Sequence, residues 1–361
     1  MYLTTVLLAS LVPRGIKAGA PRYIRQMKIL LLRFSSIGDI VLTTPVVREL
    51  ATQVPGAEVH FATKPAFRQL FDANPYVRKT HVLSGSLTEL LAELRAENFD
   101  HIIDLHNNLR TRILTVRLGV PTRRFDKLNV EKWLLVNLKI HRLPPVHIVD
   151  RYRAAAAHLG ITDDGNGLDY FIPPDKEIAL DSLPATHRTG YVAVAIGAQH
   201  YTKRLPTDKL LEACEKLAAP VVLLGGKEDA PVAAEIETHF QQRPELPTRI
   251  FNAVGRFSLH GSASLVRQAR LVVSHDTGLM HIAAAFRRPI ISIWGNTVPE
   301  FGMTPFRTEY TALEVAGLPC RPCSKIGYPK CPQGHFKCMR EQKLVALNGY
   351  SGEESGMNGV S

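Results

Sequence analysis

The segment with the clearest chemical meaning is the turn after a short apolar strand, within residues 271–284. Polar residues follow residues 271–273 directly, and a helix pattern begins behind them. They are Ser274, His275, Asp276, Thr277 and Gly278, with His281 three residues further on. A strand that enters a helix through such a turn presents free N–H groups and the positive end of a helix dipole, which suits a diphosphate. An N-cap at Asp276 or Thr277 with a core-packed histidine is the alternative; because it does not account for the whole set, we favour a ligand-binding turn.

A carboxylate follows the first apolar strand of the chain. In the run from Arg33 to Thr44, Gly38 permits a tight turn and Asp39 comes next. At the carboxyl end of a buried strand, Asp39 would face a cleft and could accept a proton from a hydroxyl nucleophile. From these residues alone, that role and a role as cap of the following helix are equally supported.

Two further strand ends carry polar residues in the second half. Gly197 is followed by Lys203, whose charge suits phosphate oxygens. Glu228, behind two glycines, is placed like the ribose-binding acid of dinucleotide sites. Together with the Asp276 turn, this order predicts a nucleotide-diphosphate site. The sequence contains neither G-x-G-x-x-G nor G-x-x-x-x-G-K-[ST], which argues against a dinucleotide oxidoreductase and a P-loop ATPase.

Parallel strands are needed to bring these turns together. Short Ile, Leu and Val runs alternate with helix patterns, which is typical of strands buried in a doubly wound α/β sheet. The predicted strands are 28–34, 58–63, 79–82, 101–105, 191–196, 220–224, 271–273 and 289–294. The predicted helical regions are 45–53, 66–72, 87–98, 108–118, 131–160, 207–217, 230–240, 262–268 and 278–285. We expect the polar turns to face one another across a cleft.

The alternation is interrupted once, which predicts two Rossmann-like domains. A stretch punctuated by Pro, Asp and Gly runs from 162 to 189, and its residues 171–189 are interpreted as the linker between an N-terminal domain, 27–170, and a C-terminal domain, 190–345. Residues 1–26 are expected to be a disordered extension and 346–361 a disordered tail. No apolar run reaches the ~18 residues that a membrane span needs, and the apolar start lacks the basic region of a signal peptide.

The chain is basic, with a net charge of +11. In residues 100–155, eleven Lys and Arg residues stand against five acidic ones. Such a stretch is either a solvated face or a site for a phosphorylated substrate, an anionic lipid or nucleic acid. Aromatic residues for base stacking are sparse there, and Phe125 and Trp133 are the ones near the middle of the stretch, so no nucleic-acid partner is expected.

Four of the five cysteines lie near the C-terminus in the spacing C-x2-C-x7-C-x6-C. They are Cys320, Cys323, Cys331 and Cys338, with His335 among them. In a cytosolic protein this group fits a metal site or reduced structural thiols equally well, and disulfides or redox chemistry less well. The spacing does not decide between these.

Together, these motifs resemble one family. From about residue 27 to 340 the chain is similar to the lipopolysaccharide heptosyltransferases of glycosyltransferase family 9, which have the GT-B fold. The resemblance rests on Arg33-x4-Gly38-Asp39 with Thr44-Pro45, Lys203 with Pro206, Glu228, Asp276-Thr277-Gly278-x2-His281, Gly295-Asn-Thr297-x-Pro299 and His147-Ile-Val-Asp-Arg151. Leu205 and Gly225 stand where the family often has aromatic residues, which leaves adenine stacking open.

The resemblance implies inverting, metal- and cofactor-independent transfer of a heptose from ADP-heptose to the lipopolysaccharide inner core. The protein would be cytoplasmic, with peripheral contact to a Gram-negative inner membrane. Asp39 matches the general base, and Lys203 the residue that steadies the leaving diphosphate. The implied donor-binding residues are Gly38, Gly197, Lys203, Glu228, Asp276, Thr277, Gly278 and His281, with Asp276 assigned to heptose hydroxyls. For the acceptor we expect Asn107, Asn108, Arg110, Arg112, Arg123 and Arg124.

Other functions remain open from the sequence. A GT-B enzyme that uses a different sugar donor is the nearest alternative. A nucleotide-sugar 2-epimerase shares the two-domain architecture, but it needs additional carboxylates around the sugar and no acceptor groove. A non-catalytic nucleotide-binding protein would tolerate the loss of Asp39 and ranks last.

Overall fold

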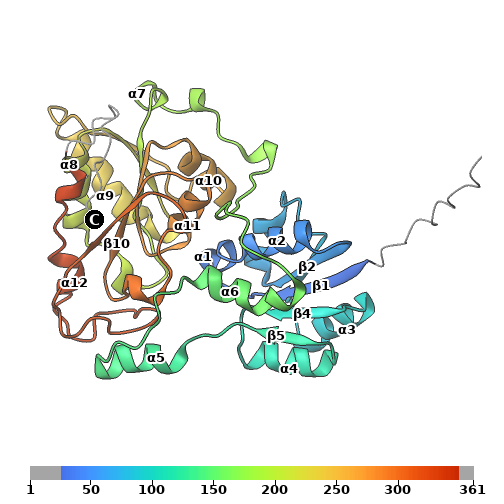
Figure 1. The fold of residues 1–361 in the computed structure, drawn as a ribbon. Coiled ribbons are helices and arrows are strands. Elements are labelled where there is room, and N and C mark those ends of the chain that lie inside the picture. The colour runs from blue at the N-terminus through green and yellow to red at the C-terminus, as the bar shows by residue number, and fades with distance from the viewer. Residues whose placement is uncertain (1–25, 349–361) are drawn as a thin grey trace, which may run out of the picture.

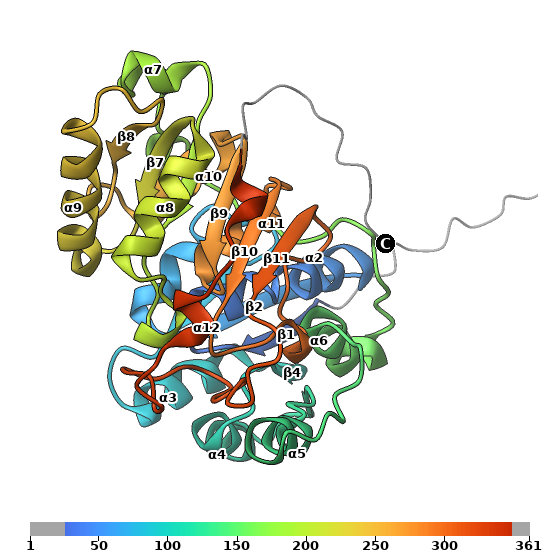
Figure 2. The same ribbon diagram turned by 90° about the vertical axis from the view of Figure 1, so that its left-hand side faces the viewer.

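The computed structural model describes residues 26–348, which form two parallel β-sheets flanked by helices (Figures 1 and 2). The first sheet has the order β3–β2–β1–β4–β5, and every strand pair in it is parallel. Its strands are β1 (Met27–Leu32), β2 (Ala57–Thr63), β3 (Lys79–Val82), β4 (His101–Asp104) and β5 (Thr122–Arg124). The central strand β1 carries four consecutive buried residues, as a strand covered on both faces requires.

The second sheet has the order β8–β7–β6–β9–β10–β11 and is also parallel throughout. Its strands are β6 (Val192–Ala195), β7 (Pro220–Leu224), β8 (Arg249–Asn252), β9 (Leu271–His275), β10 (Ile290–Trp294) and β11 (Tyr310–Glu314). Counted within this half, the order is that of dinucleotide-binding sheets. In each sheet the order reverses beside the first strand, between β1 and β4 and between β6 and β9.

Helices connect the strands, as the alternation predicted. In the first half they are α1 (Ile37–Val41), α2 (Thr44–Gln53), α3 (Leu87–Glu97), α4 (Leu109–Leu118), α5 (Asn129–Trp133) and α6 (Ile148–Ala156). In the second half they are α7 (Ala185–Arg188), α8 (Thr207–Leu217), α9 (Ala230–Gln241), α10 (Leu259–Gln268), α11 (Gly278–Ala285) and α12 (Lys337–Arg340). Between residues 26 and 348, no helix is long and apolar enough to cross a bilayer.

Residues 131–160, predicted as one helical region, form two helices with an extended segment between them. α5 continues into a π-helical turn over 134–138, and α6 begins at Ile148. Pro144 and Pro145 lie in the extended segment. Because proline has no N–H to donate and its ring clashes with the preceding turn, the helix cannot continue through them.

Sequence patterns missed the strands β5, β8 and β11, all of which lie at sheet edges. An edge strand is buried less completely, so its residues show no continuous apolar run. At the C-terminus, a 3₁₀ turn at Val345–Leu347 buries Leu347 in the second half, so residues 346–348 belong to the fold. The rest of the expected tail, and residues 1–25, lie outside the described residues.

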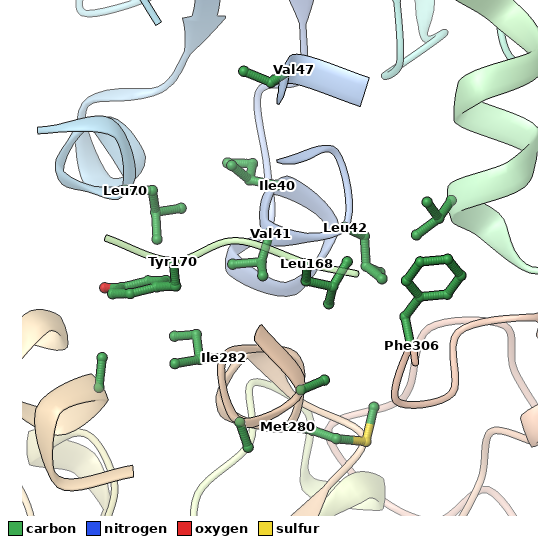
Figure 3. Close-up of a cluster of buried hydrophobic side chains, with 14 of the residues drawn as sticks. Ile40, Val41, Leu42, Val47, Leu70, Leu168, Tyr170, Met280, Ile282 and Phe306 are labelled. Atoms are coloured by element: carbon green, nitrogen blue, oxygen red, sulfur yellow. The ribbon is translucent and has the colours of Figure 1, made fainter. Parts of the chain in front are cut away.

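One hydrophobic core runs through both halves (Figure 3). Val41 of α1 and Ile282 of α11 belong to it, and both side chains are almost completely buried. Leu168 and Tyr170, from the segment that leaves the first half, lie between these two helices in Figure 3. The two sheets are therefore joined by apolar packing as well as by the chain.

Candidate active site

A cavity of about 1150 Å³ lies between the carboxyl ends of the two sheets. Its lining comes from the turns after β1 and β4 in the first half and from those after β6, β7 and β9 in the second. Both reversals of strand order therefore open into it, and such reversals are where open parallel sheets bind ligands. The volume lies at or above the upper end of the roughly 300–1,000 Å³ of small-molecule sites, which leaves room for two substrates.

The predicted donor-binding and catalytic residues all line this cavity. They are Gly38, Asp39, Gly197, Lys203, Glu228, Asp276, Thr277, Gly278 and His281. They come from both halves of the chain, and the fold brings them together in this one cavity. Their individual roles remain predictions.

The predicted acceptor residues are placed differently. Asn107, Asn108, Arg110, Arg112, Arg123 and Arg124 are not part of the cavity lining. Asn108 caps α4, because its Oδ1 accepts from the Thr111 N–H at 3.0 Å. Asn107 Nδ2 donates to the Phe125 carbonyl at 3.1 Å, and Arg124 Nη2 donates to Thr115 Oγ1 at 2.6 Å. These three contacts support the local fold. Other residues of the basic stretch line the cavity instead.

Asp39 is held in the first turn of α1 by two neighbours. Its Oδ1 lies 2.5 Å from Arg33 Nη2, while its Oδ2 accepts from the Ser36 backbone N–H at 3.1 Å and from Ser36 Oγ at 2.8 Å. Burial favours a higher pKa of the Asp39 carboxyl, but the Arg33 charge and the Ser36 hydrogen bonds outweigh it, so this pKa lies below its ordinary value. Asp39 therefore caps the helix through one oxygen and is also an ionised carboxylate in the cavity wall.

Arg33 fixes the direction of that carboxylate. Its Nη1 donates to the Leu105 carbonyl at 2.6 Å and its Nε to the Ser35 carbonyl at 2.8 Å. The guanidinium thus joins the ends of β1 and β4 and uses its remaining nitrogen for Asp39. The sequence contained Arg33 as part of a motif, but this pairing role was not predicted.

Lys203 and Asp276 form an ion pair across the donor side of the cavity. Lys203 Nζ lies 2.5 Å from Asp276 Oδ2 and 3.2 Å from the Asp276 carbonyl oxygen. Thr297 Oγ1 donates to the same carboxylate oxygen at 2.9 Å. The ammonium group is thereby placed beside the N-terminus of α11, where an anion would sit.

The start of α11 is not closed by a side-chain cap. Thr277 is the N-cap residue, but its side chain accepts no hydrogen bond from the first helical turn and its Oγ1 lies 3.2 Å from Ser274 Oγ. The cap alternative considered for Asp276 and Thr277 is therefore not what these side chains do. Gly278 lines the cavity. The N–H groups of Gly278 and of the next residues in the first turn of α11 have no acceptor within the helix.

Two buried histidines hold this turn in place. His275 Nε2 accepts from the Leu205 N–H at 3.0 Å and so fixes the turn that carries Lys203. His281 packs against Gly38 of the other half, where a Cβ atom would lie 2.6 Å from His281 Cδ2. Burial is the main cause that lowers the pKa of each histidine to about 4, so both are neutral at pH 7.

Asp229, which sequence analysis did not single out, organises the neighbouring turns. Its Oδ2 accepts from the Gly226 N–H at 2.9 Å, and its Oδ1 lies 3.1 Å from Arg204 Nη1. A Cβ atom on Gly197 would lie 1.9 Å from Asp229 Oδ2, so Gly197 makes room for this carboxylate. Glu228 is exposed and lines the cavity beside it.

Three lysines line the cavity near one another: Lys127 and Lys132 of the first half, and Lys325 of the second half, whose charge acts on both of them. Burial, together with the nearby charge of Arg151, lowers the pKa of Lys132 to about 8. Burial and the Arg33 charge also lower the pKa of Lys127. Lys127 and Lys132 belong to the basic stretch noted in the sequence, but only the fold shows which of its charges face inward.

Comparison with known proteins agrees with this geometry. The family model of glycosyltransferase family 9 (heptosyltransferase) matches residues 87–331. This chain belongs to glycosyltransferase family 9. As a family 9 member it is a glycosyltransferase, and its two facing parallel sheets are the GT-B fold.

Relatives of this family 9 chain include lipopolysaccharide heptosyltransferase 1 of Pseudomonas aeruginosa, which is 24% identical over 328 residues, 83% of this chain and 86% of the relative. Among solved structures, ADP-heptose LPS heptosyltransferase II of Escherichia coli has a TM-score of 0.63 at 22% identity, covering 89% of this chain and 99% of that one. The Escherichia coli heptosyltransferase WaaC with ADP has a TM-score of 0.60 at 21% identity, covering 83% and 96%. At these identities the structural likeness establishes the fold.

Proposed function

We propose that this family 9 enzyme transfers a heptose from ADP-heptose to a hydroxyl of the lipopolysaccharide inner core, with inversion at the anomeric carbon. The observation that carries the proposal is that Asp39 and Lys203, from opposite halves, line one cavity. A base on one side and a cation on the other are what an in-line displacement between two bound substrates needs. The names of the relatives, which are lipopolysaccharide heptosyltransferases, supply the sugar and the acceptor.

The reaction is a single displacement. The Asp39 carboxylate accepts the proton of the acceptor hydroxyl while the oxygen forms a bond to the anomeric carbon. The bond between that carbon and the diphosphate oxygen breaks on the opposite face, and its electrons leave with ADP. Lys203 and the N–H groups at the start of α11 stabilise the negative charge on the leaving group, so the proposal assigns no step to a metal ion.

Donor binding follows from the groups around the second half of the cavity. Lys203 exchanges Asp276 for a diphosphate oxygen, which frees the Asp276 carboxylate to accept from heptose hydroxyls. Glu228 binds the ribose hydroxyls. Phe257 also lines the cavity and offers an apolar ring for the adenine, in place of the family's aromatic residues that this chain lacks. The ADP bound in the solved relative supports the choice of nucleotide.

Acceptor binding is assigned to the first half and to Lys325, which the second half contributes. Core precursors carry phosphates and acidic sugars, and the inward-facing Lys127, Lys132 and Lys325 present ammonium groups to them. These lysines replace the arginines and asparagines that the sequence suggested, because the latter do not reach the cavity.

We also propose that the protein is cytoplasmic and contacts the inner face of the membrane through the side on which α4 and α5 lie (Figures 1 and 2). Large apolar side chains are exposed there: Leu109 74%, Val116 77%, Val130 68% and Trp133 55%. On α4, Leu109, Ile113 and Val116 recur at helical spacing, which places them on one face. Arginines accompany them at positions 110, 112 and 117. A basic helix with one apolar face suits an anionic lipid surface.

A donor screen tests the proposed function. The enzyme is incubated with ADP-, UDP- and GDP-sugars and a core-precursor acceptor, with EDTA present, and the products are identified by mass spectrometry. We expect mass transfer to the acceptor from ADP-heptose. Release of an epimerised free sugar, transfer from a different nucleotide-sugar, or a requirement for magnesium would each contradict the corresponding part of the proposal.

Sedimentation with vesicles containing anionic lipid, compared for the native chain and Leu109→Asp/Val116→Asp, tests the membrane contact.

A further inference from the structure

A second, small cavity lies beneath the segment that follows β11 and leads into α12. Its volume is about 20 Å³, which is room for roughly one water-sized sphere. Cys320, Cys323, Cys331 and Cys338 all line it, although they are spread along the segment, and none is in a disulfide. The active-site chemistry proposed above uses none of them.

We propose that these four cysteines bind one metal ion and that the resulting centre braces the donor side of the active site. Four thiolates complete the tetrahedral set of a structural site, which suits zinc first and iron second. No three of the four sulfur atoms lie within 4.8 Å of one another. An ion would therefore draw the segment inward and close the small cavity.

His335 fits beside such a centre as a hydrogen-bond donor and not as a fifth ligand. Its Nδ1 accepts from the Lys337 N–H at 3.0 Å, so the neutral ring carries its proton on Nε2. That Nε2 lies 3.8 Å from Cys320 Sγ and points its N–H at the sulfur. A thiolate bound to a cation accepts such a bond, and donors of this kind orient metal ligands.

Asn296 is a second, independent sign that the cavity is incomplete. This side chain is 1% exposed and lines the cavity, yet neither its Nδ2 nor its Oδ1 has a hydrogen-bond partner. A buried amide without partners costs free energy. Thiolates drawn inward by an ion would accept from Nδ2, which accounts for an asparagine at this place.

Four sulfur atoms around one small cavity need a cation if they are to be thiolates. A bound ion offsets the repulsion among neighbouring thiolates and stabilises the deprotonated sulfurs.

The segment that carries the cysteines is tied to both sides of the active site. Tyr328 N donates to Thr202 Oγ1 at 2.8 Å, and Thr202 directly precedes Lys203 in the chain. Arg321, between the first two cysteines, donates from Nε to the Gly295 carbonyl at 2.7 Å and from Nη2 to the Thr297 carbonyl at 3.0 Å. The same Thr297 donates to Asp276, so Arg321 and Thr297 would connect the metal centre to the donor-binding pair.

The first half is attached to the same segment. Lys139 Nζ donates to the Pro322 carbonyl at 2.7 Å and to the Cys320 carbonyl at 3.4 Å. Lys325, two residues after Cys323, reaches the active-site cavity. A fixed geometry at the cysteines therefore positions one of the cations assigned to the acceptor.

Elemental analysis of the full-length protein, purified without chelator, tests the proposal. We expect about one zinc or iron per chain. Reconstitution of stripped protein with Co²⁺ should give the strong thiolate-to-cobalt charge-transfer and visible bands of a tetrahedral site. Cys320→Ser and Cys331→Ser, at partly exposed positions, should lose the ion, while Cys214→Ser, a cysteine of α8 that does not line this cavity, should retain it.

Loss of the ion should also increase cleavage by protease within residues 324–336 and weaken ADP binding, with the protein still folded by circular dichroism. Protein that contains no stoichiometric metal and gives no cobalt spectrum would overturn the proposal. Two disulfides among the four cysteines, detected by mass spectrometry without reduction, would overturn it as well.

Discussion

Gly38 and His281 are in direct contact although they belong to different halves of the molecule. A Cβ atom on Gly38 would lie 2.6 Å from His281 Cδ2, and one on Gly278 would lie 2.7 Å from Ile37 Cγ2. The turn that carries Asp39 and the turn that begins α11 thus pack against each other at the base of the cavity. Their relative position is set by two residues that lack a side chain.

Gly38→Ala should therefore separate these two turns. Because the new methyl group meets a buried ring, we expect a cost of about 1–3 kcal/mol in the free energy of unfolding and a fall in kcat larger than the change in donor Kd. Gly85→Ala is the control, since its Cβ would meet only the flexible end of Glu89. Equal effects of the two variants on kcat would show that the close contact is unimportant.

Asp39→Asn should remove the base and leave the fold unchanged. The amide oxygen can still accept from Ser36, so α1 keeps its cap, but it cannot take a proton. We expect kcat to fall by about 10²–10⁴-fold with donor affinity nearly unchanged, measured by single-turnover transfer and by calorimetry with ADP. The exposed Asp175→Asn should behave as the native enzyme. Near-normal turnover of the Asp39→Asn variant would rule out this base.

Arg33→Gln should change how the rate depends on pH. In the native protein the Arg33 charge keeps the pKa of Asp39 below its ordinary value, so the carboxylate remains ionised as the pH falls through that value. Without the guanidinium, burial dominates and the pKa rises. The acidic limb of the kcat/KM profile should then move to higher pH, whereas Arg33→Lys should move it less. An unmoved limb would mean that the limb belongs to another group.

Lys203→Met should weaken binding of the diphosphate. A charge-assisted hydrogen bond contributes about 1.5–3 kcal/mol, so we expect the Kd for ADP to rise by roughly 10- to 100-fold. Lys209→Met is the matched control, since Lys209 pairs with Glu212 on α8 and does not line the cavity. Isothermal calorimetry measures both variants. The idea fails if adenosine, which has no phosphate, loses as much affinity as ADP.

His275→Gln should make the protein less sensitive to acid. The folded-state pKa of His275 is lowered to about 4, below the ~6.5 of an unfolded chain, so the neutral ring favours folding above pH 6.5. That contribution is lost as the pH falls from about 6.5 toward 4. Glutamine keeps an acceptor for the Leu205 N–H but takes up no proton. Urea denaturation at several pH values should show a flatter profile for this variant than for the native chain or for the exposed control His141→Gln.

The sequence could locate the polar turns because one local rule places them. In a parallel sheet, residues after buried strands meet at one edge, so Asp39, Lys203, Glu228 and Asp276 needed no knowledge of tertiary contacts. The buried strands themselves were predicted for the same reason, from continuous apolar runs.

What the sequence could not show depends on distant neighbours. Arg124 and Lys132 are both basic residues in one stretch, but β5 pairs its Arg124 with the sheet while α5 turns Lys132 into the cavity. In the sequence, Asp229 does not differ from other acidic residues at helix starts. Its role depends on Gly197, a residue of another turn that makes room for its carboxylate. The strand β5 was missed because an edge strand of three polar residues carries no apolar pattern.

The closely spaced lysines of the cavity also couple acceptor binding to the uptake of a proton from the solvent. With a pKa of about 8, Lys132 is partly deprotonated at mildly alkaline pH. An anionic acceptor that settles against it raises that pKa again, and the enzyme must then take a proton from the buffer. Near pH 8, the measured heat of binding should therefore depend on the ionisation enthalpy of the buffer, and apparent affinity should decline as the pH rises further.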